Sequence, residues 1–240
     1  MKKTTNNSIN QKRSKHQLET IPTVPDLAPG TKVISKTDFS VVYADPPWNI
    51  NQTGSYGALQ HYNLMTLDRI KAMPVASLTR ENAACFLWIP NGLLQEGLDV
   101  LKAWGFTYRS PFYWIKAMAG LALGQYFRNC SETLLLGTKG KMPVEFKAQP
   151  NWGYFPRQEH SRKPEEVYYI IERLYPNREY LELFARNRVQ HKNWWIWGNE
   201  AEGGSDVYIP GYPVPEYSGK VKFIPPAGKV ISAAPIEEES

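Results

Sequence analysis

The chain has 240 residues, of which 42% are apolar, and 28 Lys and Arg face 23 Asp and Glu, a formal net charge of +5. This apolar content excludes a wholly disordered chain, and 17 Gly and 19 Pro are too few for a collagen-like or low-complexity polymer. The two cysteines exclude a disulfide framework and a four-thiolate zinc site, and no apolar run is long enough to predict a transmembrane helix.

The length favours one domain with additions at its ends. Residues 1–30 are polar, contain several Lys and Arg, and lack an apolar segment, so they do not read as a secretory signal. They predict a flexible basic N-terminal arm, either a disordered tail or an arm that touches phosphates. The catalytic domain is expected over 31–200. Residues 201–240 form a Pro/Gly-rich C-terminal extension, expected to wrap the surface or to be disordered.

The first predicted element is a buried strand over residues 39–44, where FSVVYA is β-branched and aromatic. It stops at Asp45-Pro46-Pro47, because two prolines cannot continue a ladder. The strand therefore delivers Asp45 at its carboxyl end. After a loop over 49–63, Thr66 is expected to cap a short helix that ends at Pro74.

A second buried strand is predicted over residues 85–89, and Asn91 is expected to cap a helix that runs to Trp104 and ends at Gly105. The helix's apolar stripe consists of Leu93, Leu94, Leu98, Val100 and Leu101.

Further strands are predicted over 107–116, 133–137 and 144–148. Pro164 then opens a helix through Leu174, with an apolar stripe that faces the core. The last predicted strands cover 180–184 and 194–197.

Strands that alternate with helices predict an α/β sandwich with a mostly parallel sheet. In such sheets, ligands bind beyond the carboxyl ends of the strands, which is where Asp45 is expected.

Asp45-Pro46-Pro47-Trp48 is the most informative tetrapeptide of the chain. A carboxylate and a carbonyl oxygen accept hydrogen bonds only, and Pro47 has no N–H to compete. A site lined by such acceptors suits an amino group with two hydrogens to donate, and an indole beside it offers a planar face for stacking. A planar aromatic amine, such as adenine or cytosine, fits this description.

The strand followed by these four residues resembles the amino-methyltransferases that modify exocyclic nitrogens of bases, and Trp48 indicates the MT-A70-like adenine N6-methyltransferases among them. The resemblance runs from about Val41 to Glu200. Further motifs agree in type and order: Tyr56-Gly57, Phe86-Leu87-Trp88, Trp114-Ile115-Lys116, Ser161-Arg162-Lys163-Pro164, Ile171-Glu172-Arg173-Leu174, Glu182-Leu183-Phe184-Ala185-Arg186, Asn193-Trp194 and Gly198-Asn199.

The resemblance implies a Rossmann-like three-layer methyltransferase sandwich of the permuted β type, in which the catalytic motif precedes the cofactor-binding strand. It also implies S-adenosyl-L-methionine as cofactor. The permuted order explains why the chain has no GxGxxG loop.

The resemblance also implies the roles of individual residues. The catalytic residues are Asp45, Pro46, Pro47 and Trp48, with the amino group held by Asp45 and the Pro46 carbonyl. Tyr56 and Trp114, together with Trp48, are expected to shape the base pocket. The expected cofactor-binding residues are Asp45, Lys163, which would meet the methionyl carboxylate, and Arg186, Asn199 and Glu200, around the ribose and adenine.

The chain departs from the family pattern at several of these positions. Ala185 stands where relatives often have Gly, Arg188 and Val189 stand where the best-known relatives have His and Asn, and Glu200 replaces a Gln. A carboxylate can still accept from ribose hydroxyls. An acidic cofactor contact upstream of the catalytic strand is also expected, with Asp26 as its candidate.

Other residue types carry structural expectations. Trp194, Trp195 and Trp197 are expected in the core, and Cys85 and Cys130 as buried thiols. His61, His160 and His191 lack metal-ligand spacing and are assigned no metal. Arg157, Arg162 and Lys192 could face the phosphates of a nucleic acid.

We therefore expect a DNA adenine N6-methyltransferase of bacterial or phage type, located in the cytoplasm, or in the nucleus if eukaryotic. RNA adenine methylation with the same site, and a non-catalytic nucleic-acid-binding subunit on the same fold, remain alternatives. The expected partners are DNA, or else RNA, and no membrane; a homodimer or a methyltransferase-like partner subunit remains open.

Overall fold

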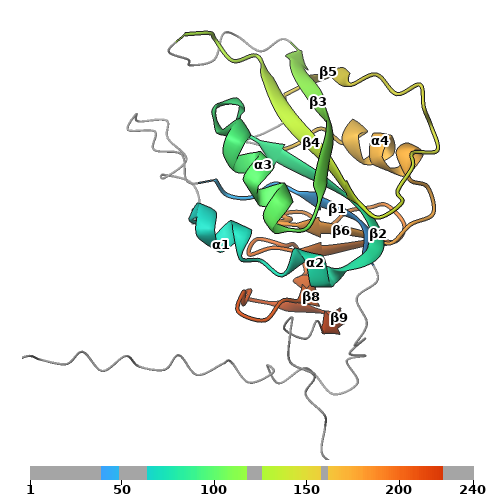
Figure 1. Cartoon of the computed structure of the whole chain (residues 1–240). Helices are drawn as coiled ribbons and strands as arrows, with labels where there is room; N and C mark the ends of the chain where they lie inside the picture. Colours follow the sequence, from blue (N-terminus) through green and yellow to red (C-terminus); the bar gives the residue numbers. More distant parts are fainter. Residues whose placement is uncertain (1–38, 49–63, 118–125, 158–161, 224–240) are drawn as a thin grey trace, which may run out of the picture.

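The computed structural model describes residues 39–48, 64–117, 126–157 and 162–223. Its centre is a seven-stranded sheet in the order β5-β3-β4-β2-β1-β6-β7 (Figure 1). The strands are β1 (Phe39–Ala44), β2 (Thr79–Ile89), β3 (Thr107–Ala117), β4 (Ser131–Lys139), β5 (Trp152–Pro156), β6 (Tyr180–Leu183) and β7 (Trp194–Trp197).

The sheet is mixed but mostly parallel. The pairs β1–β2, β1–β6, β6–β7 and β3–β5 are parallel, whereas β4 runs antiparallel to both β2 and β3. This confirms the predicted α/β class. The described helices are α1 (Leu67–Lys71), α2 (Val75–Leu78), α3 (Leu94–Ala103) and α4 (Glu166–Leu174), with a 3-10 turn over Asn91–Leu93.

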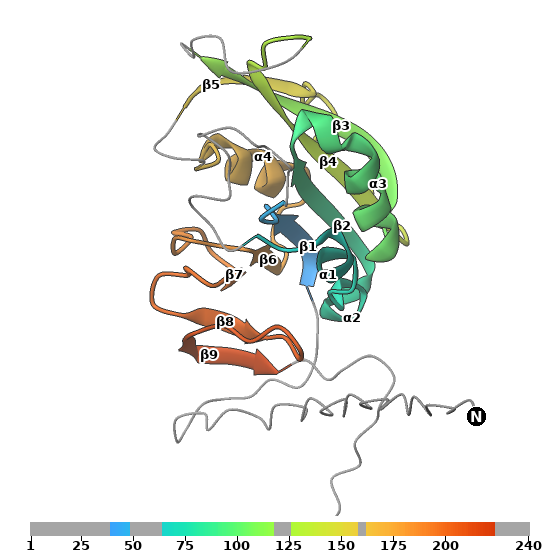
Figure 2. The same ribbon diagram turned by 90° about the vertical axis from the view of Figure 1, so that its left-hand side faces the viewer.

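Helices cover both faces of the sheet, with α1 to α3 on one side and α4 on the other (Figure 2). The alternation in β1 shows why: Val42 and Ala44 belong to the apolar core that includes α1 to α3, whereas Val41 and Tyr43 belong to the core beneath α4. Because successive side chains of a strand point to opposite faces, a short apolar strand supplies both cores. The carboxyl end of β1 is thereby held rigidly between two layers.

Most predicted elements are confirmed, with β2 beginning at Thr79 rather than Cys85. Thr66 caps α1 by accepting from the N–H of Arg69 at 3.3 Å, and Gly105 ends the region after α3 with φ of +82°. The Trp-rich strand is packed as expected, since Trp194 and Trp197 are buried and Trp195 is partly buried against the core.

The strand predicted over 144–148 is wrong, because the edge strand of the sheet is β5 instead. The N–H of Glu145 donates to the carbonyl of Leu174 at 2.9 Å, so this segment is tied to the end of α4 rather than to a ladder.

Asn91 was expected to cap the following helix, but α3 begins at Leu94 without a side-chain cap. The Asn91 side chain contacts β4 instead, where it donates to the carbonyl of Ser131 at 3.0 Å and accepts from Thr133 Oγ1 at 2.7 Å.

The predicted apolar stripe of α3 is confirmed except at Leu94: Val100 and Leu101 are buried, and Leu93 and Leu98 are partly buried against the core. Leu94 is 51% exposed, and the buried residues of the helix are Gly97, Val100 and Leu101. A Cβ at position 97 would lie 2.5 Å from Ile89 Cγ2, so glycine permits close contact between α3 and β2.

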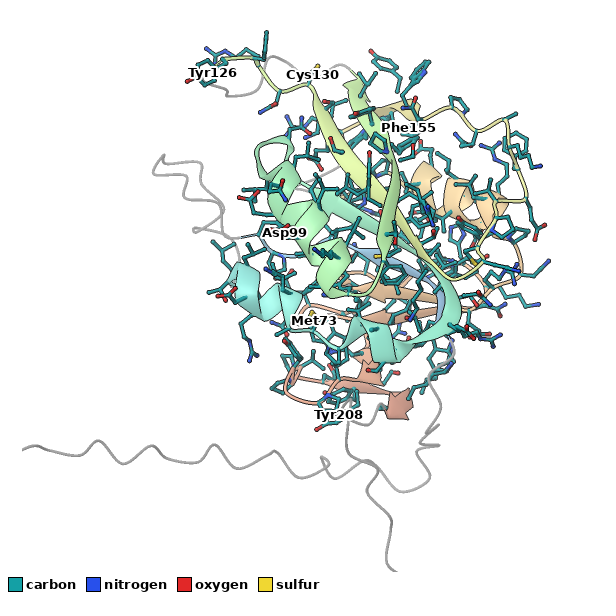
Figure 3. The ribbon with its side chains drawn as sticks, viewed as in Figure 1. Met73, Asp99, Tyr126, Cys130, Phe155 and Tyr208 are labelled. Carbon is teal, nitrogen blue, oxygen red and sulfur yellow. The ribbon has the colours of Figure 1, made fainter. Side chains whose placement is uncertain are left out.

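Of the two cysteines, Cys85 is buried as predicted, but Cys130 is exposed. Cys130 lies just before β4, near the end of the molecule that carries Tyr126 and far from Tyr208 of β8 (Figure 3). Its thiol is therefore accessible to solvent among the described residues.

The C-terminal segment adds a separate parallel pair, β8 (Ser205–Tyr208) and β9 (Tyr217–Phe223), beside β7 (Figure 2). Side chains of β8 bond to the outer edge of β7: the N–H of Ile196 donates to Asp206 Oδ2 at 3.2 Å, and that of Gly198 donates to Ser205 Oγ at 3.0 Å. Val207, Ile209 and Val214 join the core on the α1 to α3 side. The described part of the C-terminal extension is therefore built into the domain.

The N-terminal arm, Asp26, Tyr56, His61 and His160 lie outside the described residues. Within the ranges that are described, no helix is long and apolar enough to cross a membrane.

Candidate active site

Asp45 lies where β1 leaves the sheet, as the sequence predicts. The turn that follows is closed by two backbone hydrogen bonds, from Trp48 N–H to the Pro46 carbonyl at 2.8 Å and from Met65 N–H to the Pro47 carbonyl at 3.0 Å. A carbonyl oxygen has two lone pairs, so the Pro46 carbonyl keeps one for a ligand. The turn thus holds the carboxylate and this carbonyl in a fixed relation.

Asp45 belongs to a cluster of four charged groups. Lys163 Nζ lies 2.7 Å from Asp45 Oδ2 and 3.2 Å from Glu132 Oε2, and Lys116 Nζ lies 2.6 Å from Glu132 Oε1. Asp45 comes from β1, Glu132 from β4 and Lys116 from β3, while Lys163 precedes α4. The cluster therefore links three strands and the start of α4 around one carboxylate.

The titration behaviour of the cluster follows from this geometry. Burial raises the pKa of Asp45, and the Lys163 ammonium only partly opposes it. Burial alone would lower the pKa of Lys163, but the Asp45 and Glu132 carboxylates outweigh it and raise that pKa. Burial also disfavours ionised Glu132, yet Lys163 and Lys116 bring the pKa of Glu132 below its ordinary value. Lys163 is therefore a firmly charged cation beside the predicted catalytic carboxylate.

Two adjoining cavities, of about 550 and about 520 Å³, meet at Asp45. Both are lined by Asp45, Phe184, Arg186 and Glu200. We call the cavity that also contains Lys163 the lysine cavity and the other the proline cavity, after Pro47, Pro213 and Pro215 in its wall. Together they form one elongated cleft beyond the carboxyl ends of β1, β6 and β7.

The structure brings together most of the residues predicted to bind the cofactor. Asp45, Lys163, Arg186 and Glu200 line the lysine cavity, and Asn199 joins Glu200 in the proline cavity. Arg186 Nε lies 3.7 Å from Glu200 Oε2. Phe184, at the end of β6, has φ of +65°. A left-handed residue turns the chain sharply, which places Phe184 and Arg186 in the cleft wall.

The predicted base-pocket residues are placed differently. Trp48 is only 6% exposed, donates from Nε1 to the Trp88 carbonyl at 3.0 Å and lines neither cavity. Trp114 is buried as well and donates to the Phe155 carbonyl at 3.0 Å. In this structure both indoles support the strands around the site. Tyr56 falls outside the described residues.

The sequence did not single out several residues of the cleft. Glu182 on β6 lines the lysine cavity, and Tyr168 OH donates to its Oε2 at 2.9 Å. Burial, with a contribution from Asp45, raises the pKa of Glu182 to about 8. Glu182 lies within β6, whose other residues are buried, and a charged residue inside a buried strand is the signal that could have found it. Glu132 offered no such signal, because only the pairing of β4 brings it to Asp45.

These residues fit the parts of S-adenosylmethionine. The Lys163 ammonium suits a carboxylate, and the carboxylate of Asp45 suits an ammonium group. Asn199 and Glu200 can accept from ribose hydroxyls. Apolar side chains of Pro47, Val214 and Trp197 in the proline cavity suit a purine. The cofactor would supply a methyl group on a positively charged sulfur.

Comparisons with known proteins agree with this site. The MT-A70 family model matches residues 39–200. The chain is 31% identical over 171 residues to an N(6)-adenosine-methyltransferase MT-A70-like protein of Arabidopsis thaliana, covering 69% of this chain and 24% of that protein. It is 30% identical over 173 residues to the N(6)-adenosine-methyltransferase catalytic subunit METTL3 of Homo sapiens, covering 69% of this chain and 28% of METTL3.

A bacterial relative is of more similar length. The chain is 26% identical over 189 residues to the type II methyltransferase M.MunI of Mycoplasma sp, covering 70% of this chain and 79% of M.MunI. By contrast, the matched region spans only about a quarter of the adenosine methyltransferases. The family match covers the whole sheet and most of the cleft, so the chain belongs to the MT-A70 family, whose methyltransferases depend on S-adenosylmethionine.

Proposed function

We propose that the chain transfers a methyl group from S-adenosylmethionine to the exocyclic N6 amine of adenine in DNA. The observation that carries the proposal is the position of Asp45: its carboxylate lies at the junction of two cavities, beside a carbonyl that still has a free lone pair. The Asp45 carboxylate and the remaining lone pair of the Pro46 carbonyl can only accept hydrogen bonds, which suits an amino group that donates two.

Asp45 would act by orientation and charge. Hydrogen bonds to its carboxylate and to the Pro46 carbonyl fix both amine hydrogens and leave the nitrogen lone pair directed at the electrophile. The nitrogen becomes positively charged as its new bond forms, and a carboxylate already in place stabilises that charge without reorganisation. No covalent enzyme intermediate is required, so the chain contributes mainly positioning and electrostatics.

Lys163 would bind both the catalytic carboxylate and the cofactor. Its ammonium has three donors, and Asp45 and Glu132 account for two of them. The third can meet the carboxylate of the cofactor. Lys163 would then hold the cofactor and Asp45 in register, which is what a direct transfer between two bound partners needs.

DNA is proposed as the target because the chain matches most of a type II methyltransferase of similar length. Arg157, Arg162 and Lys192 are exposed and could contact phosphates. The names of the relatives from Arabidopsis thaliana and Homo sapiens favour adenosine in RNA as the second candidate. In either case a paired adenine must leave its stack, at a cost of a few kcal/mol.

The test is to incubate the purified chain with deuterated-methyl S-adenosylmethionine and one sequence presented as duplex DNA, single-stranded DNA or RNA. Mass spectrometry of the digested nucleosides is expected to show labelled N6-methyldeoxyadenosine, formed at least a hundredfold more slowly by the Asp45→Asn chain. Label only in N6-methyladenosine would establish the RNA alternative. Label only in cytosine would overturn adenine as the target, and no label in any arm would overturn catalysis.

A further inference from the structure

We propose that the C-terminal β8–β9 unit completes the cofactor site, with Val214 between Pro213 and Pro215 forming one wall of the purine slot. These residues lie beyond residues 39–200, which the family model matches. The inference rests on the proposed function only for the identity of the cofactor, not for the target nucleic acid. Four features of the described residues support it.

The first is the unequal chemistry of the two cavities. The lysine cavity contains the ammonium of Lys163, whereas the proline cavity contains Val214 and Trp197 but not Lys163. S-adenosylmethionine has a carboxylate at one end and a purine at the other. Matching charge to charge and apolar face to apolar wall places the carboxylate in the lysine cavity and the purine in the proline cavity.

The second is the position of the polar groups that the cavities share. Arg186 and Glu200 line both of them, and Asn199 lies at the proline-cavity side. Asn199 and Glu200 follow directly after β7, where an acidic or amide side chain accepts from ribose hydroxyls in nucleotide-binding α/β sheets. The ribose therefore falls between the two cavities, and the purine must extend toward Val214.

The third is the anchoring of the segment that carries Val214. The Arg69 guanidinium donates to the Gly211 carbonyl at 3.1 Å and stacks over the Tyr212 ring at 4.6 Å. The Tyr212 hydroxyl donates back to the Arg69 carbonyl at 2.8 Å. Tyr212 and Val214 are both 8% exposed. The wall is thus fixed to α1 and not a free loop.

The fourth is an ion pair that ties the other end of the unit to the cofactor cleft. Arg188, which lines the lysine cavity, bonds through Nη1 to Asp206 Oδ2 at 2.6 Å and through Nη2 to the Gly204 carbonyl at 2.7 Å. Asp206 is only 2% exposed and also bonds to Ser218. The unit therefore supplies Val214 to the wall of the proline cavity and holds Arg188, which lines the lysine cavity, through Asp206 and Gly204.

The test compares two identical truncations in the full chain. Val214→Ala removes methyl groups from the purine slot. Val207→Ala removes the same groups from β8, where Val207 is buried in the same core but lines neither cavity. Calorimetric titration with S-adenosylhomocysteine is expected to give about five- to tenfold weaker binding for Val214→Ala and unchanged binding for Val207→Ala. Thermal unfolding of both variants identifies the temperature at which each is fully folded for the titration.

A second probe, 5′-methylthioadenosine, has the purine and ribose but no amino acid. Val214→Ala should weaken it by the same factor as S-adenosylhomocysteine, whereas Lys163→Ala should weaken only S-adenosylhomocysteine. Equal affinity of the unaltered and Val214→Ala chains for both probes would overturn the inference and leave the proposed function standing. The inference would also be overturned by a Val214→Ala chain that binds both probes normally but requires a higher nucleic-acid concentration for half-maximal methylation. The slot would then hold the target base and not the purine of the cofactor. Failure of the unaltered chain to bind S-adenosylhomocysteine would overturn the proposed function as well.

Discussion

Lys163 Nζ lies 2.7 Å from Asp45 Oδ2, although the two residues are 118 positions apart in the chain. The contact exists because β1 ends beside the segment that leads into α4, and Glu132 of β4 holds the same ammonium from a second side. With Lys116, the cluster contains two carboxylates and two ammonium groups, so its charges balance. Each member can therefore be tested by a substitution that removes charge and keeps shape.

Asp45→Asn is expected to lower the rate of methyl transfer by roughly 10²–10⁴, the scale found for positioned acid–base and oxyanion groups. Asparagine is nearly isosteric but cannot stabilise the positive charge on the nitrogen. Single-turnover kinetics with bound cofactor measure the chemical step directly. Asp99→Asn on α3, away from both cavities, is the matched control and should keep its rate. Full turnover by a folded Asp45→Asn chain would remove Asp45 from the mechanism.

Glu132→Gln should raise the KM for S-adenosylmethionine by about tenfold or more, because charge-assisted hydrogen bonds to Lys163 and Lys116 are each replaced by weaker ones. Asp45 would then be the only carboxylate paired with Lys163. The Asp45 carboxylate would be less available to the amine, so the rate of transfer should also fall. Steady-state kinetics that vary the cofactor separate these two effects. Glu96→Gln on α3 is the control. Unchanged KM and rate would show that Glu132 does not position Lys163.

The sequence predicts those parts of the site that depend on local pattern. FSVVYA followed by two prolines defines both the strand and the point where Asp45 leaves it, and this is what the structure shows. The family resemblance likewise identified Lys163, Arg186, Asn199 and Glu200, which all line the cleft.

What depends on pairing between distant strands could not be predicted. Glu132 comes near Asp45 only because β4 pairs with β2, where Thr133 is opposite Ile89, and β2 pairs in turn with β1. Residues 144–148 have strand composition, yet a bond to the end of α4 takes them out of the sheet. Val214 lies in a Pro- and Gly-rich segment, which predicts a surface path, and only contacts with α1 and β7 bring it to the cleft.

Gly198→Ala should destabilise the fold by about 1–3 kcal/mol, the cost of overpacking a closely packed site. A Cβ there would lie 2.1 Å from the carbonyl oxygen of Ala185 and 2.7 Å from its nitrogen, so the backbones at the ends of β6 and β7 would have to separate. Asn199 would move with them, and affinity for S-adenosylhomocysteine should fall. Urea denaturation measures the first effect. Gly92→Ala, where no atom lies within 4 Å, is the control and should leave the midpoint almost unchanged.

Replacing Arg157, Arg162 and Lys192 by Gln should weaken DNA binding most at low salt, if these cations contact phosphates. Each contact that is lost should reduce the slope of log K against log salt concentration by about 1. Fluorescence anisotropy with a labelled duplex at several salt concentrations gives the slope. Arg162 also lines the lysine cavity, so the folding control is the chain with only Arg157 and Lys192 replaced, whose affinity for S-adenosylhomocysteine should stay the same. A slope equal to that of the unaltered chain would remove these residues from the interface.

The titration of Glu182 should lower the free energy of unfolding as the pH rises toward 8. Burial raises its pKa to about 8 in the folded chain, whereas in the unfolded chain it ionises at its ordinary, lower value. Between these values the folded state retains a proton that the unfolded state has lost, so stability decreases by up to about 1.4 kcal/mol per pH unit. Below the ordinary pKa both states are protonated, and the full contribution is present.

Glu182→Gln cannot titrate, yet its amide oxygen can still accept from Tyr168 OH, which donates to Glu182 at 2.9 Å. Relative to the unaltered chain, the variant should therefore gain stability steadily between pH 5 and pH 8. Denaturant unfolding at pH 5, 6.5 and 8 measures the difference in free energy at each point. A difference that stays constant across this range would mean that Glu182 is already ionised in the folded protein, and that its carboxylate faces the cleft as an anion at neutral pH.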